Sequence, residues 1–251
     1  MKFRYKKLAG MIVSLLLLSL LSISFTYAEA PTATYEVTIT NLTDGQAFSP
    51  PVVVTHRQST DIFNVGDEAS LAIQEIAENG NNEPMLAALG ADKHVFDFTQ
   101  VADGNEGPAP LIPADNPGQV PFANSATYTV TAGQGVKYLS AAMMLICTND
   151  GFTGIDSVRL PKEVGDSTTV HTAGYDAGTE INTEDFADIV PPCQVLIGIS
   201  SEDSGTGTTN PDLAEDDVIR HHPGIVGGGD LVPGVHGWID PVAEIVITRV
   251  N

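Results

Sequence analysis

Short segments of alternating apolar and polar residues, separated by Gly and Pro, most restrict the fold of this 251-residue chain. Residues 34–40 show the pattern: Tyr35, Val37 and Ile39 fall on one face and Thr and Glu on the other, which is the period of a half-buried strand. Further strands are expected at residues 52–56, 95–98, 127–131, 138–147, 195–200 and 244–250. Many strands, frequent turn residues and little helix predict an antiparallel β-sandwich.

Helical periodicity is limited to one convincing segment. Asp67 or Ser70 can cap its start, apolar residues between 73 and 77 form one face, and Gly80 ends it. A second short helical turn is expected over residues 84–89. We therefore expect one or two short helices beside the sheets.

The first 28 residues have the composition of a secretory signal. Basic residues extend to Lys7, an apolar stretch runs from Leu8 to Phe25, and the small residue Ala28 completes a cleavage site. A membrane anchor is the alternative, because about 20 apolar residues span a bilayer. We expect cleavage after Ala28, export to the periplasm or the medium, and a single β domain over residues 29–251 without a later transmembrane segment.

The chain that remains after cleavage is strongly acidic. It holds 7 basic against 32 acidic residues, a formal charge of −25. Such a chain repels nucleic acid and anionic membranes, so neither is expected as a partner. Solubility or a salty environment explains most of these carboxylates, since a cation site needs only a few.

Cys147 and Cys193 are the two cysteines, and an exported chain can oxidise them. A bridge across this separation would stabilise the fold by roughly 4 kcal/mol on the chain-entropy model. Alternatively, they are two small buried residues at strand ends, since both adjoin apolar runs. Sequence alone leaves both interpretations open.

Two short segments are rich in oxygen donors. They are residues 148–156, with the sequence T-N-D-G-F-T-G-I-D, and residues 175–180, with the sequence Y-D-A-G-T-E. Calcium takes six to eight oxygen ligands, and glycine-containing turns let carboxylates and backbone carbonyls converge on one ion. The two segments are therefore interpreted as two halves of one calcium site.

Together with H-P-G-I at residues 222–225 and W-I-D-P-V-A at residues 238–243, these segments resemble a bacterial member of the spondin N-terminal domain family. The resemblance runs from about Tyr35 to the end of the chain. It implies a sandwich related to the C2 domain, with calcium as the cofactor.

The resemblance also implies the calcium ligands, which correspond to Asp150, Asp176 and Glu180. Glu180 departs from the family pattern, because animal relatives carry Asp there, and its longer side chain can ligate from further away. Asn149 is a weaker candidate for a carbonyl ligand, and Asp156 for a partner of the ligands. The alternative is that each acid is a turn residue that bonds its own backbone.

The histidine pair at residues 221 and 222 suggests a transition metal, but Pro223 holds the preceding residue extended, so the two rings should point to opposite sides. His222 near Asp230 could face the acidic site, although capping a strand or lining a groove is the simpler interpretation. Trp238 is expected to pack in the core or at its rim.

Sequence motifs of serine hydrolases, zinc proteases and nucleotide-binding loops are absent. We therefore predict a secreted calcium-binding module, not an enzyme, that serves adhesion or binds an extracellular protein or glycan. One alternative is a calcium-dependent hydrolase with Asp156 or His222 as its base. Another is a purely structural surface protein in which calcium only rigidifies the fold.

Overall fold

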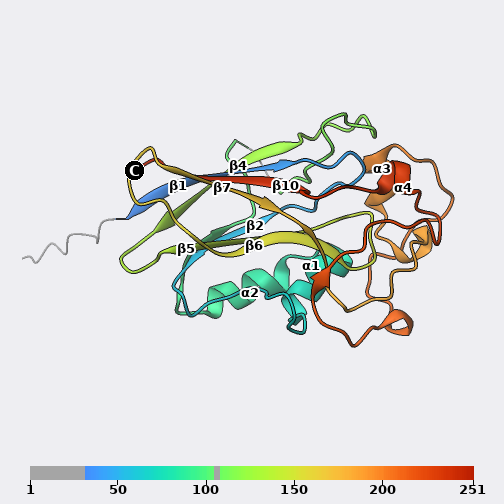
Figure 1. The fold of residues 1–251 in the computed structure, drawn as a ribbon, viewed down its shortest axis with the longest axis horizontal. Helices are drawn as coiled ribbons and strands as arrows, with labels where there is room; N and C mark the ends of the chain where they lie inside the picture. The colour runs from blue at the N-terminus through green and yellow to red at the C-terminus, as the bar shows by residue number, and fades with distance from the viewer. Residues whose placement is uncertain (1–31, 105–107) are drawn as a thin grey trace, which may run out of the picture.

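Two antiparallel sheets stacked on one another form the body of the computed structural model, which describes residues 32–104 and 108–251 (Figure 1). One sheet has the strand order β4-β1-β10-β7 and the other β3-β2-β5-β6-β8-β9. The strands are β1 (Ala33–Asn41), β2 (Val52–His56), β3 (Val95–Thr99), β4 (Ser125–Ala132), β5 (Tyr138–Met144), β6 (Gly151–Arg159), β7 (Ser167–Thr172), β8 (Gly174–Asp176), β9 (Arg220–His221) and β10 (Ala243–Arg249). The predicted antiparallel sandwich is confirmed, whereas the predicted signal segment lies outside the described residues.

Among the described residues, four short α-helices accompany the sheets, where one or two were predicted: α1 (Leu71–Asn79), α2 (Glu83–Ala91), α3 (Pro192–Ile197) and α4 (Pro233–His236). Of the two predicted caps, Asp67 and Ser70, it is Ser70 that caps α1, since its hydroxyl accepts a hydrogen bond from the Ile73 amide. The helix stops at Gly80, as predicted, and the φ of 61° there suits glycine. No helix in the described part of the chain is long and apolar enough to cross a membrane.

The strand predicted at residues 195–200 is wrong, because α3 occupies the first half of this segment. Pro191 and Pro192 stand at the start of α3, where proline is tolerated, and Gly198 ends it. An apolar run of this length is compatible with either a strand or a buried helix, and the flanking prolines decide in favour of the helix.

The strand β2 separates two hydrophobic cores. Val53 packs between the two sheets together with Ile39 of β1, whereas Val52 and Val54 point the other way and pack with the apolar face of α1. Every residue of β2 and of β5 is consequently buried. The helices α1 and α2 therefore complete the fold by covering the outer face of the six-stranded sheet (Figure 1).

The strand β6 was not predicted, because its glycines and threonines hide the alternation expected of a strand. It pairs with β5, and Ala142 lies opposite Gly154. A Cβ atom at Gly154 would lie 2.1 Å from the carbonyl oxygen of Ala141, so only glycine allows the two backbones to approach this closely.

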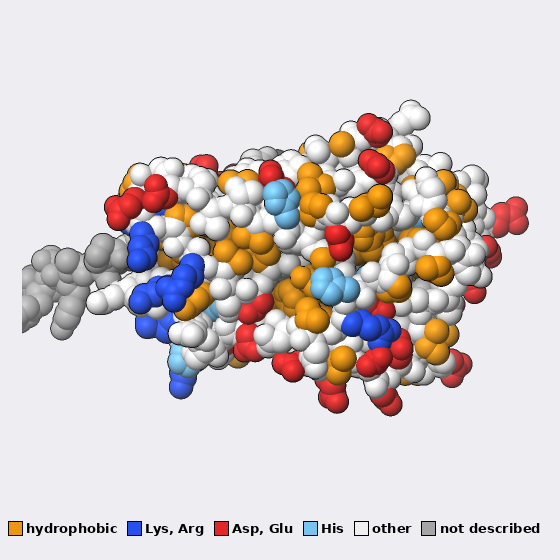
Figure 2. All heavy atoms as spheres, viewed as in Figure 1, with side chains coloured by type: hydrophobic (Ala, Val, Ile, Leu, Met, Phe, Trp, Pro, Cys, Tyr) orange, Lys and Arg blue, Asp and Glu red, His pale blue; other side chains and the backbone are white. Residues whose placement is uncertain are grey.

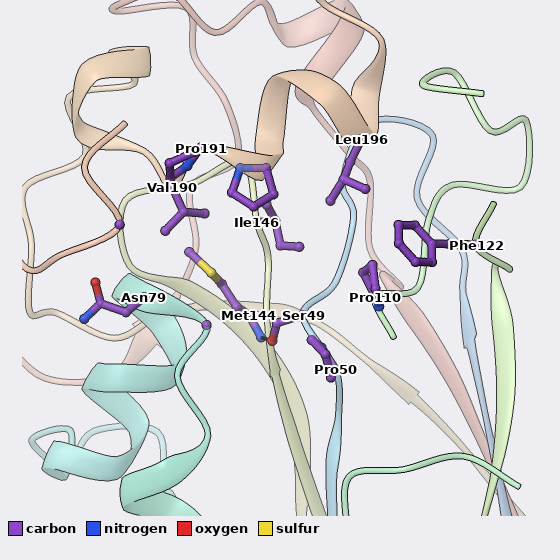
Figure 3. A pocket seen from close by; sticks show the side chains of 13 residues that line it. Ser49, Pro50, Asn79, Pro110, Phe122, Met144, Ile146, Val190, Pro191 and Leu196 are labelled. Atoms are coloured by element: carbon purple, nitrogen blue, oxygen red, sulfur yellow. Dashed lines mark hydrogen bonds between the residues drawn. The ribbon is translucent and has the colours of Figure 1, made fainter. Parts of the chain in front are cut away.

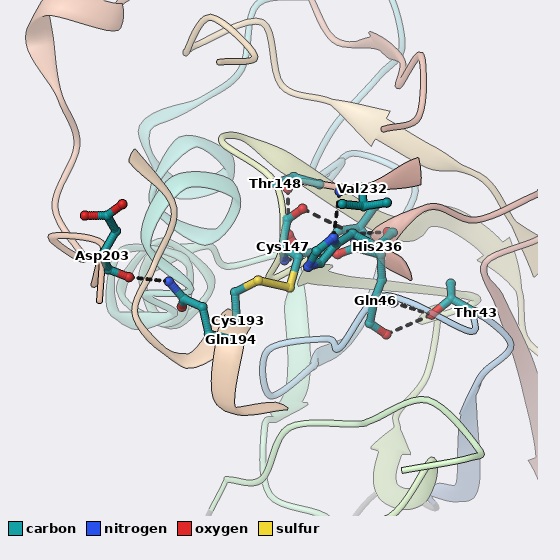
Figure 4. Close-up of a disulfide and its surroundings, with 10 residues drawn as sticks. Thr43, Gln46, Cys147, Thr148, Cys193, Gln194, Asp203, Val232 and His236 are labelled. Atoms are coloured by element: carbon teal, nitrogen blue, oxygen red, sulfur yellow. Dashed lines mark hydrogen bonds between the residues drawn. A yellow bond between two sulfur atoms is a disulfide. The ribbon is translucent and has the colours of Figure 1, made fainter. Parts of the chain in front are cut away.

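A disulfide between Cys147 and Cys193 joins the loop after β5 to α3 (Figure 4). The Gln46 side chain holds the same loop: its amide nitrogen donates to the carbonyl oxygen of Cys147 at 3.2 Å, and its oxygen accepts from the amide of Cys147 at 3.0 Å. Both cysteines are fully buried. The bridge thus fixes α3 against the end of β5, next to the start of β6.

Replacing both cysteines with alanine should lower the free energy of unfolding by about 2–4 kcal/mol, because the bridge closes a loop of 46 residues in the unfolded chain. Urea denaturation of the variant and of the parent, each with and without reductant, measures the loss. Reductant should destabilise the parent and leave the variant unchanged. A loss below about 1 kcal/mol would contradict the expected contribution.

Candidate functional site

The pairing of β6 with β8 brings the two oxygen-rich segments together. Gly151 lies opposite Asp176 in this register, so Asp150 stands beside Asp176. The backbone continues the contact past the strands, since the amide of Ala177 donates to the carbonyl oxygen of Asp150 at 3.1 Å. Two segments separated by 18 residues of sequence therefore form one cluster at one end of the six-stranded sheet.

Asp150 is a fully buried carboxyl group with one satisfied and one unsatisfied oxygen. Its Oδ2 accepts hydrogen bonds from the amides of Thr179 at 2.8 Å and Glu180 at 3.1 Å. Its Oδ1 has no partner. Burial, together with repulsion from Asp176, raises the pKa of Asp150 to about 7.

Asp176 is also buried, but both of its oxygens have partners. Its Oδ1 accepts from the amide of Gly178 at 2.8 Å, and its Oδ2 accepts from the side-chain amide of Asn182 at 2.8 Å. The Arg220 guanidinium lies 3.1 Å from the same Oδ2. Arg220 also pairs with Glu215 and Asp217, so its guanidinium group forms salt bridges with three carboxylates.

Glu180 completes the predicted set and is nearly fully buried. Its Oε1 accepts from the amide of Asn210 at 2.7 Å. Burial, with repulsion from Glu78, Asp150 and Asp188, raises the pKa of Glu180 to about 7. The three predicted acids thus share one electrostatic environment, although within the described ranges no three His, Cys, Asp or Glu side chains are arranged to hold one metal ion.

The donors of this cluster nonetheless fit a hard cation. Asp150, Asp176 and Glu180 offer only oxygen atoms, which calcium prefers. A buried carboxylate oxygen without any partner, as at Asp150 Oδ1, is costly unless a proton or a cation satisfies it. That orphaned oxygen is the feature that a bound cation would explain.

The two weaker candidates have other partners. Asn149 accepts from the amide of Glu184 at 3.2 Å and donates to the Thr183 hydroxyl at 3.1 Å, so it fixes the neighbouring loop. Asp156 lies further along β6, where its Oδ1 accepts from the amide of Ile62 at 2.8 Å and the hydroxyl of Ser140 at 3.0 Å. Asp156 thus connects β5 and β6 to the loop before α1.

The two adjacent histidines contact different aromatic rings. His221 lies 5.4 Å from the ring of Tyr175, and His222 lies 5.0 Å from that of Trp238. The Nδ1 atom of His222 accepts from the amide of Gly224 at 3.0 Å, and burial lowers the pKa of His222 to about 4. Trp238 is half-buried and packs against both cores, which agrees with the predicted packing role.

Glu184 organises the loop next to the cluster, and the sequence patterns did not predict a role for it. Its carboxylate accepts three hydrogen bonds of 2.6–2.7 Å, from the amides of Val226, Gly227 and Gly228. Its backbone carbonyl accepts from Asp230, the residue expected near the histidines. The glycine run at residues 227–229 was the available signal, because successive amides there can surround an anion.

A separate apolar cavity of about 430 Å³ lies next to α3 (Figure 3). Met144 and Ile146 form one wall, and Val190, Pro191 and Leu196 form another. None of the acids described above lines this cavity. It is therefore distinct from the acidic cluster.

Comparison with known proteins identifies one family. The family model described as Spondin_N matches residues 34–184, which run from the second residue of β1 to beyond β8 and include all three predicted ligands. None of the curated proteins compared with the chain gives a significant match.

The buried carboxyl of Asp150 should make stability depend on pH when calcium is chelated. The pKa of about 7 in the folded state lies above the ordinary value of an aspartate, so between pH 5 and pH 7 the folded state keeps a proton that the unfolded state has lost. The free energy of unfolding therefore falls as pH rises from 5 to 8. Asp150→Asn removes this penalty. The free energy of unfolding of the variant, relative to that of the parent, should therefore be about 2–3 kcal/mol higher at pH 8 than at pH 5. Urea denaturation in chelator at both pH values tests this, and a pH-independent difference would contradict it.

Proposed function

Because the chain belongs to the spondin N-terminal domain family, an extracellular type of domain, we propose that it is a secreted, calcium-stabilised module that binds an extracellular protein or glycan. Export is supported by the disulfide and by the signal-like composition of the first 28 residues. The binding role extends the family assignment, since a fold by itself does not determine function.

The orphaned Oδ1 of Asp150 is the observation that carries the calcium part of the proposal. Asp150, Asp176 and Glu180 would hold the ion. A bound Ca²⁺ would supply the positive charge that the buried carboxyl groups lack. Arg220 already supplies part of that charge at Asp176, so calcium would add to an internal counter-ion.

The chain's own residues connect such an ion to a surface. The amides of Thr179 and Glu180 bind Asp150, the amide of Asn210 binds Glu180, and Arg220 joins the loop at residues 215–217. Loops from three parts of the sequence thus share the acidic cluster. Neutralising the cluster would hold these loops in one arrangement and present them to a partner.

An enzymatic role needs a general base that can reach substrate beside the ion. His222 is one candidate, but its Nδ1 accepts a hydrogen bond from the amide of Gly224 and its Nε2 is buried. Asp156 is engaged by Ile62 and Ser140. These contacts support a binding module over a hydrolase.

Calcium should raise the melting temperature of the mature protein relative to chelator. An ion that binds only the folded state contributes about 2.7 kcal/mol at a hundredfold excess over its Kd. Asp176→Asn should remove most of this response, because it removes one negative charge from the cluster. Scanning calorimetry with calcium and with chelator measures both effects.

Asp156→Asn is the matched control, since it makes the same change of charge and side chain on β6, outside the acidic cluster. Asparagine keeps an Oδ1 atom that can accept both hydrogen bonds of Asp156, so the variant should remain folded and keep the full calcium response. An unchanged response in Asp176→Asn would place the ion elsewhere.

His222→Ala separates the module from the hydrolase. A binding module needs no base, so the variant should bind calcium within about threefold of the parent, well under 1 kcal/mol. Neither protein should hydrolyse esters, glycans or phosphodiesters. A turnover that vanishes in His222→Ala, while fold and calcium affinity persist, would establish the hydrolase instead.

A further inference from the structure

Lys and Arg side chains gather at the end of the sandwich opposite the acidic cluster. Figure 2 shows them at the left end of the molecule, at the same end as the start of β1 in Figure 1. The described chain holds seven such residues: Arg57, Lys93, Lys137, Arg159, Lys162, Arg220 and Arg249. Only Arg220 lies in the acidic cluster.

Four of these seven residues line one cavity of about 260 Å³. Its lining residues are Tyr35, Val136, Lys137, Arg159, Leu160, Pro161, Lys162 and Arg249. No acidic side chain is among them. Residues 29–251 hold 32 acidic against 7 basic residues, so this concentration of positive charge is unexpected from composition alone.

The positive charges of this cavity have no Asp or Glu partner among the described residues. Among the described residues, Arg220 is the only Lys or Arg that forms a salt bridge. Glu163 and Asp166 lie in the adjacent turn, but neither pairs with the cavity's cations. Four like charges without an Asp or Glu partner repel one another, and an anion between them would relieve that repulsion.

Arg249 and Tyr35 hold the walls of the cavity, whereas two of the other cations make no side-chain hydrogen bond. Arg249 donates from Nε to the carbonyl oxygen of Asn251 at 2.8 Å and from a terminal nitrogen to that of Lys162. The Tyr35 hydroxyl donates to the carbonyl oxygen of Pro161 at 3.2 Å. Lys137 makes no side-chain hydrogen bond, and Arg159 only stacks over the ring of Tyr138, at 5.4 Å. Lys137 and Arg159 are therefore free to bind.

We propose that this cavity binds a sulfate or phosphate group, either as the free ion or as an ester on an extracellular polymer. Guanidinium and ammonium groups together suit a multiply charged oxyanion. Tyr35 is buried, so the cavity offers no exposed aromatic face for stacking a sugar ring. The acidic remainder of the molecule repels a long polyanion lying along its side, which favours a single group entering end-on.

This site is separate from the proposed calcium site. Asp150 precedes β6 and Arg159 ends it, so the two positions are about 27–30 Å apart along the strand. That separation is several times the screening length of about 8 Å at physiological ionic strength. Oxyanion binding should therefore be equal with and without calcium.

Titration calorimetry with sodium sulfate, against sodium chloride of matched ionic strength, tests the site. Arg159→Gln and Lys137→Gln should each weaken sulfate binding at least fivefold, because each removes one charge from the cavity. Lys93→Gln is the control: it removes the same charge from an exposed side chain outside the cavity and should change the affinity less than twofold.

Two results would overturn the proposal: sulfate that binds no better than chloride, and an equal loss in Lys93→Gln, which would show a diffuse charge effect. Dextran sulfate and uncharged dextran then identify the source of the group. Tighter binding of dextran sulfate than of free sulfate, per sulfate group, supports a polymer-borne ester. Equal binding per group supports the free ion.

Discussion

The antiparallel pairing of β6 with β8 is the interaction on which the acidic cluster depends. It places Asp150 beside Asp176, and the backbone contact from Ala177 to Asp150 extends it into the loops. The other edge of β6 requires Gly154, because a side chain there would collide with β5. The position of the cluster therefore follows from backbone geometry, and the acids themselves oppose it through burial and mutual repulsion.

The unfavourable free energy of burying these mutually repelling carboxyl groups explains the polar contacts around the cluster. Backbone amides bind Asp150, Asp176, Glu180 and Glu184, and Arg220 gives Asp176 a permanent counter-charge. Each bond recovers part of the cost of removing a carboxylate from water. The orphaned oxygen of Asp150 marks where this compensation is incomplete.

Charge is distributed unevenly over the whole molecule. A net charge of −25 for residues 29–251 could be spread evenly for solubility alone, yet positive side chains collect at one end and buried acids at the other. An arrangement of this kind orients an approaching charged partner before contact. The two ends can therefore serve different ligands without competing.

Local patterns were sufficient to predict part of this structure. The alternation in residues 34–40 and the capped, periodic segment ending at Gly80 identified β1 and α1, since both signals depend on neighbouring residues. Residues 195–200 were assigned the wrong element because a short apolar run has no period of its own, and the glycines of β6 concealed a buried strand.

The sequence by itself determined the class of fold, the acidic character and the two segments that carry oxygen donors. Only the tertiary structure decided which distant residues meet: Cys147 with Cys193, Arg220 with Asp176, and Lys137 and Arg159 around one cavity. The reason is physical. Periodicity and turn chemistry act over a few residues, whereas these contacts depend on strand register and sheet order, which neighbouring residues do not encode.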